Sequence, residues 1–135
     1  IQMSAAEHCL NEEQMRLSVS DFESFTNGKI VPLLIVTGIS GNIINLSVLL
    51  DGSMRTRSNT LLAWLAMTDI FFLLCMIPHS LATYSTFASS FSFRVVYLSY
   101  KLNLLGMLNW ASVSAIWLVL LVCLERLLAI RWPLV

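Results

Sequence analysis

The sequence predicts an all-α membrane protein with three transmembrane helices, because of its composition, its charge spacing and three long apolar segments. Of its 135 residues, 57% are hydrophobic and 12% are charged, whereas a soluble domain is about half apolar and about a quarter charged. One small core cannot bury that much apolar surface, so lipid is the expected solvent. The formal net charge is +0, which gives no basic excess for binding nucleic acid.

Three segments are long enough to cross a bilayer as helices. Residues 30–50 and 102–124 carry no charge, and between Arg57 and Arg94 the one charged residue is Asp69. About 20 helical residues cross the roughly 30 Å hydrocarbon core. An open sheet of three strands would leave backbone groups unpaired in lipid, so the segments should be helical. The expected helices cover about residues 30–50, 59–82 and 102–130.

Residues 1–29 are expected to form a polar tail, because their acidic side chains exclude the positive and apolar regions of a signal peptide. The chain begins at Ile1 and stops two residues after Pro133, so we expect it to be a piece of a longer protein. Cys9 in the tail can pair with a thiol outside this chain, whereas the other two cysteines lie in apolar segments and suit packing. Four basic residues flank the segments on each side, so the positive-inside rule leaves the orientation open.

Asp69, near the middle of the second segment, is the first candidate functional residue. A carboxylate at the centre of a membrane helix costs roughly 2.5–3.5 kcal/mol, so Asp69 should face other helices or water, paired or protonated. The alternative is a polar residue that the interior merely tolerates. Asn42 in the first segment is a natural hydrogen-bond partner, although its neighbourhood also suits helix packing without any further role. The small and polar stripe around it is Gly38, Gly41, Asn42 and Asn45.

Glu125 and Arg126 close the third segment and are the second candidate. Adjacent residues on a helix point about 100° apart, so the two are not the usual i,i+4 pair. Charged residues often end helices, and the pair alone is a weak signal. Residues of the third segment spaced by alternating steps of four and three lie on one face of the helix, and Arg126 is the last of them. It would therefore lie at the base of any cavity between the helices. The residues of this face are Leu108, Ser112, Ala115, Val119, Val122 and Arg126.

In combination, these motifs resemble the rhodopsin-like (class A) G-protein-coupled receptors over about residues 30–134. The resemblance implies that the chain holds the first three helices of a seven-helix bundle. It also implies an extracellular tail at 1–29, a partial receptor domain at 30–135, and a multi-pass protein of the plasma membrane whose third helix ends in the cytoplasm. The matching residues, in the family's order, are Gly41-Asn42, segments 59–62 and 65–69, Pro78, Ile116 and Glu125-Arg126.

The resemblance also implies roles and partners. Asn42 and Asp69 would belong to the signalling core of the bundle. Arg126 would be restrained by Glu125 at rest and released to contact a heterotrimeric G protein, as a two-state element biased by an extracellular ligand. The positions that would line the ligand pocket are Leu108 and Ser112. The resemblance implies no cofactor, no catalytic residue and no nucleic-acid partner.

Several positions depart from the family's pattern. Leu127 replaces the aromatic residue that usually follows the acid–arginine pair, and Lys101 stands where a disulfide-forming cysteine is usual. Ala115 replaces the hydroxyl that usually helps Asp69 to hold sodium, which argues against a metal site there. Leu108 occupies the position of the amine-binding aspartate, so we expect a peptide rather than a monoamine as ligand. Segments 54–56 and 125–130 are similar to those of invertebrate neuropeptide receptors of the FMRFamide type.

Two other functions remain open from the residues alone. A three-helix subunit of a channel or transporter would explain Asp69 as part of an ion path, but it would not explain the ordered motifs. The sequence Gly38-Ile39-Ser40-Gly41 matches the G-x-S-G of rhomboid-type proteases. However, Ser40 and His79 would lie roughly 10 Å apart in depth, too far for a hydrogen bond between a nucleophile and its base. We therefore expect no enzyme.

Overall fold

Three long helices form the structure, which is a computed structural model that describes residues 17, 20–51 and 56–131. They are α3 (Val31–Leu49), α4 (Arg57–Leu81) and α6 (Phe91–Arg131). Shorter elements are α2 (Asp21–Phe25), the π-helix η2 (Thr26–Ile30) and α5 (Ser85–Ala88). The described residues hold helices and turns but no strand, so the predicted all-α fold is confirmed.

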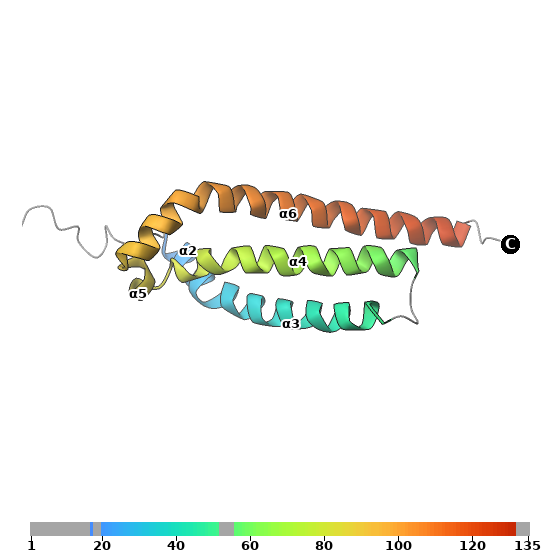
Figure 1. Ribbon diagram of the computed structural model, residues 1–135, viewed down its shortest axis with the longest axis horizontal. Coiled ribbons are helices and arrows are strands. Elements are labelled where there is room, and N and C mark those ends of the chain that lie inside the picture. The colour runs from blue at the N-terminus through green and yellow to red at the C-terminus, as the bar shows by residue number, and fades with distance from the viewer. Residues whose placement is uncertain (1–16, 18–19, 52–55, 132–135) are drawn as a thin grey trace, which may run out of the picture.

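Helix α4 lies between α3 and α6 and packs against both of them (Figure 1). We call the end that holds α2, η2, α5 and the start of α6 the α5 end. The opposite end, where α3 stops, α4 begins at Arg57 and α6 finishes at Arg131, is the loop end. The candidate site residues of the sequence lie in the middle of the bundle and at the loop end.

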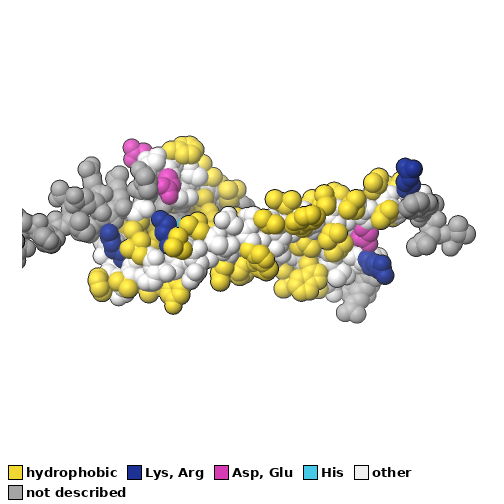
Figure 2. All heavy atoms as spheres, turned by 90° about the horizontal axis from the view of Figure 1, so that it is seen from above, with side chains coloured by type: hydrophobic (Ala, Val, Ile, Leu, Met, Phe, Trp, Pro, Cys, Tyr) yellow, Lys and Arg dark blue, Asp and Glu magenta, His cyan; other side chains and the backbone are white. Residues whose placement is uncertain are grey.

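The apolar side chains of the helices point mostly outward. All three long helices are long and apolar enough to cross a membrane by length and composition. Among the described residues no large side chain is fully buried, and Trp110 and Ile116 are each 68% exposed. Figure 2 shows apolar side chains along α6 and the charged ones gathered toward the two ends. This distribution suits a bundle whose middle is covered by lipid or by further helices.

Helix α6 begins at Phe91, whereas the sequence predicted a start at about residue 102. The prediction took Lys101 as the boundary, but a charge marks the edge of the hydrocarbon core and does not stop a helix. The helix has 41 residues, which at 1.5 Å each span ~60 Å, about twice the thickness of that core. Figure 1 shows the first part of α6 bending toward α5, so this part is an extension beyond the apolar segment.

Part of the predicted polar tail is also helical, from Asp21 to Ile30. The helix starts there because the Ser20 hydroxyl accepts a hydrogen bond from the Phe22 amide at 3.3 Å, and Asp21 and Glu23 lie in the first turn, where acidic groups favour a helix N-terminus. The predictions for Cys9, for the loop at 52–55 and for Pro133 concern positions outside the described residues.

Candidate functional site

A cavity of about 390 Å³ lies between α3 and α4 and brings the two predicted core residues together. Asn42 and Asp69 both line it and are half-buried. Among the hydrogen bonds of the described residues, none joins the Asn42 amide to the Asp69 carboxyl group, so the expected direct pair is replaced by a shared cavity. The space is large enough to hold water, which could hydrate both groups. The other lining residues are Asn45, Val48, Leu49, Leu62, Leu65 and Ala66.

The glycines of α3 differ in what they face. A Cβ atom added at Gly38 would lie 2.7 Å from Cδ1 of Leu73 in α4, whereas one added at Gly41 would meet nothing within 4 Å. Gly38 therefore permits the close approach of α3 and α4 that the sequence predicted. Gly41 does not take part in that contact.

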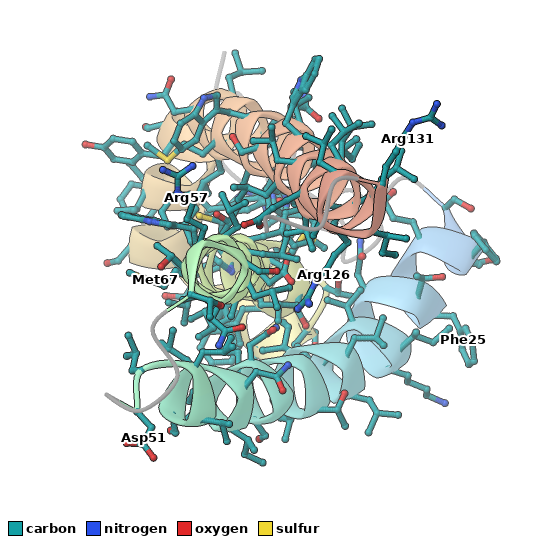
Figure 3. The ribbon with its side chains drawn as sticks, turned by 90° about the vertical axis from the view of Figure 1, so that its right-hand side faces the viewer. Phe25, Asp51, Arg57, Met67, Arg126 and Arg131 are labelled. Atoms are coloured by element: carbon teal, nitrogen blue, oxygen red, sulfur yellow. The ribbon has the colours of Figure 1, made fainter. Side chains whose placement is uncertain are left out.

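Helix α6 packs through a face that repeats in steps of four and three, and this face ends at Glu125. Leu108 on this face is 7% exposed and Ser112 beside it is half-buried, while Arg126 is exposed. The sequence placed Arg126 at the base of the space between the helices; the side chain is exposed, but it points into that space (Figure 3). The buried and half-buried residues of the face are Leu104, Leu108, Ala111, Ala115, Leu118, Val122 and Glu125.

Glu125 and Arg126 have different surroundings at the loop end. Glu125 lines a cavity of about 630 Å³ between α6 and α4, together with Arg57. Its Oε2 atom is buried and has no hydrogen-bond partner. Figure 3 shows Arg126 pointing into the space between the three helices and Arg57 on a different side of α4. Arg57, the first residue of α4, was not among the predicted site residues.

The α5 end is fastened by hydrogen bonds that the sequence analysis missed. Pro32 has no N–H, so it cannot donate to the carbonyls four and five residues before it. The Ser80 hydroxyl donates to the Asn27 carbonyl at 2.8 Å, and the Tyr84 hydroxyl donates to the Gly28 carbonyl at 2.6 Å. Hydroxyl groups from α4 and from the turn after it thus replace the donor that Pro32 lacks and hold η2 against α4. Pro32 is the residue from which the sequence could have predicted that these carbonyls need other donors.

A second contact at the α5 end joins α4 to α6. The Tyr97 hydroxyl and Nδ1 of His79 are hydrogen-bonded at 2.8 Å, and the two rings meet edge to face with centroids 5.6 Å apart. Phe93 stacks on Tyr97 at 5.7 Å. Ser40 of the protease-like motif donates to the Val36 carbonyl at 2.8 Å. The hydroxyl and the imidazole of the protease hypothesis therefore each have a different partner.

Three curated proteins of Caenorhabditis elegans match the chain, and all bear the names of G-protein-coupled receptors. One is 50% identical over 131 residues, which are 97% of this chain and 31% of that protein. A galanin-like receptor is 28% identical over 90% of the chain, and a third receptor is 31% identical over 77% of it. The chain spans 24% to 31% of the length of these relatives. No protein-family profile and no solved structure matches it.

The relatives and the three long apolar helices agree with one another, since receptors of this kind are all-α membrane proteins that cross the bilayer several times. They also exclude the protease hypothesis, because the relatives are named as receptors and not as enzymes. The chain is homologous to the G-protein-coupled receptors and matches about a third of the length of one of them.

Proposed function

We propose that the chain forms the first three helices of a class A receptor that transmits the binding of an extracellular ligand to a heterotrimeric G protein. The observation that carries this proposal is the 50% identity to a receptor over 97% of the chain, together with the family's motifs in their order. In this proposal, residues 1–29 and the α5 end are extracellular, and Arg57 and Arg131 at the loop end are cytoplasmic. The protein is a multi-pass receptor of the plasma membrane.

The cavity between α3 and α4 supports a signalling role for Asn42 and Asp69. Polar groups within a membrane helix cost free energy unless they meet water or other polar groups. A cavity lined by both residues supplies such a place near the middle of the bundle, and it can change its hydration when the helices move. Arg126 points into the space between the helices at the loop end, where a G protein would approach. We therefore assign the coupling role to Glu125 and Arg126.

The ligand in this proposal is a peptide. Binding a monoamine requires a carboxylate as counter-ion, but no acidic residue lies between Phe71 and Leu124, and Leu108 of the packed α6 face is buried. A matching relative is named as a galanin-like receptor, which favours a neuropeptide, and segment 125–130 favours the FMRFamide type.

The test is to express the whole receptor that contains this chain in cells with a reporter of G-protein dissociation. A library of amidated neuropeptides should yield at least one sub-micromolar agonist, whereas dopamine, octopamine and serotonin should give no response. Arg126→Ala, matched for surface expression, is the control that should bind the agonist and lose the signal. A sub-micromolar response to a monoamine would refute the peptide assignment, and a signal that survives Arg126→Ala would refute the coupling role.

A further inference from the structure

One carboxylate oxygen of Glu125 lacks a partner inside the described bundle. Its Oε2 atom is buried without a hydrogen-bond partner, and the side chain belongs to the face of α6 that packs on α4. A buried carboxylate without a partner costs more than most single interactions contribute. A cation or a strong donor within reach of Glu125 would remove this cost.

Two arginines compete for this carboxylate. Arg126 follows Glu125 directly, so its side chain leaves the helix about 100° away, and Figure 3 shows it pointing into the space between the three helices. Arg57 instead lines the same cavity as Glu125, from the first turn of α4. Arg57 is exposed.

The cavity itself favours a pair across it. Apart from the two charged residues and one hydroxyl, its lining is mostly apolar, and its α6 residues lie within two turns of the helix. Such a lining lowers the local dielectric constant and strengthens the attraction between opposite charges. The planar guanidinium group also matches a carboxylate with two parallel hydrogen bonds. The other lining residues are Thr60, Leu61, Trp64, Leu121, Leu124 and Leu128.

We infer that the ionic partner of Glu125 is Arg57 of α4, and that this pair between helices leaves Arg126 unrestrained. Arg57 is a positioning residue, because it acts on Arg126 through Glu125. This inference rests on the proposed receptor function for its signalling consequence, but the pair itself does not depend on that function. If Arg57 loses its charge, Arg126 becomes the nearest cation for Glu125 and is held back.

A charge exchange in the whole receptor tests the pair. Arg57→Glu and Glu125→Arg should each lower the thermal midpoint of the detergent-solubilised receptor by several degrees, because each puts two like charges at the cavity. The double variant Arg57→Glu/Glu125→Arg should recover at least half of the loss. Arg131→Glu is the matched control, since Arg131 is exposed at the end of α6 and points away from the bundle. It should leave the midpoint unchanged.

Signalling supplies an independent readout. Arg57→Gln should lower ligand-independent signalling at least two-fold at matched surface expression, because Glu125 then pairs with Arg126. Arg57→Gln/Glu125→Gln should restore it, since no carboxylate remains to hold Arg126. Failure of the double charge exchange to recover stability overturns the pair. Recovery of stability without any change in basal signalling in Arg57→Gln overturns the positioning role. An absence of signal from the wild-type receptor with every ligand counts against the proposed function instead.

Discussion

Removing the Tyr97 hydroxyl is the sharpest test of the fastening at the α5 end. Tyr97 is 6% exposed, and its hydroxyl is hydrogen-bonded to Nδ1 of His79 at 2.8 Å. Nε2 of the same imidazole is buried without a partner, so Tyr97→Phe leaves both ring nitrogens unsatisfied by the described residues. Phenylalanine keeps the ring that stacks on Phe93. The substitution therefore isolates one hydrogen bond.

The expected loss is about 1 kcal/mol. A net hydrogen bond contributes roughly 0.5–1.5 kcal/mol, and those between membrane helices average about 0.6 kcal/mol with a maximum near 1.7 kcal/mol. Tyr97→Leu should cost roughly 1 kcal/mol more, because it also removes the aromatic contacts with His79 and Phe93. In a receptor-sized protein, 1 kcal/mol corresponds to a shift of the thermal midpoint on the order of 2 °C.

The assay is the thermal midpoint of the detergent-solubilised receptor, followed by size-exclusion chromatography with fluorescence detection. Tyr100→Phe deletes the same atom from a tyrosine that is 59% exposed one turn further along α6, and it should not change the midpoint. In a His79→Leu background, Tyr97→Phe should cost nothing further, because the partner is already gone. The reasoning is refuted if Tyr97→Phe costs as much with His79 replaced as with His79 present, or if Tyr100→Phe is equally destabilising.

Two further substitutions test the interface between α3 and α4. Gly38→Ala places its Cβ 2.7 Å from Leu73 Cδ1, so the end of the Leu73 side chain must shift and the thermal midpoint should fall slightly. Gly41→Ala has open space around it and should leave the midpoint unchanged or raise it through better helix propensity. Equal effects of the two substitutions would show that Gly38 is not the contact point. Asp69→Ala should impair ligand-stimulated signalling by at least ten-fold in potency or by most of its amplitude while surface expression stays largely intact. Unchanged signalling in Asp69→Ala at matched expression would show that Asp69 is only a structural residue. Replacing sodium by a larger cation should have little effect on signalling by the wild-type receptor, because Ala115 offers no side-chain oxygen to hold the ion.

The number and type of long helices could be predicted from composition because lipid imposes them: a backbone that crosses a membrane must satisfy its own hydrogen bonds. Helix ends could not be predicted in the same way. Arg94 and Lys101 mark where the bilayer ends, but a helix continues past that point if its turns find support, as α6 does from Phe91. Residues 21–30 likewise form helical turns because Ser20 caps them and α4 supplies hydroxyl partners.

The candidate site could be predicted where the polarity of a side chain alone decides which way it faces. Asn42 and Asp69 had to face inward, and they line one cavity. At the end of α6, orientation depends on the phase of the repeat. Two series of residues start at Leu108 and alternate steps of four and three. The series that begins with a step of four ends at Arg126, and the one that begins with a step of three passes through Ala111 and ends at Glu125. The residues of the second series are the more buried ones. The two series share Leu108, Ala115 and Val122, so the sequence pattern separates them poorly. The contact between His79 and Tyr97 depends on the turn through α5 that joins their helices, and local pattern does not reveal it.

The contrast between the two ends of α4 has a mechanical consequence. Hydrogen bonds from Ser80 to Asn27, from Tyr84 to Gly28 and between His79 and Tyr97 gather at the α5 end, while open pockets of about 270, 390 and 630 Å³ lie beside the first half of α4. If α4 tilts about the α5 end, its displacement grows along the helix toward Arg57. Over the 25 residues of α4, roughly 37 Å at 1.5 Å per residue, a tilt of about 5° displaces the free end by ~3 Å. A small adjustment among ring contacts at the α5 end is thus enlarged at Arg57, where open volume can absorb the travel without breaking packed contacts.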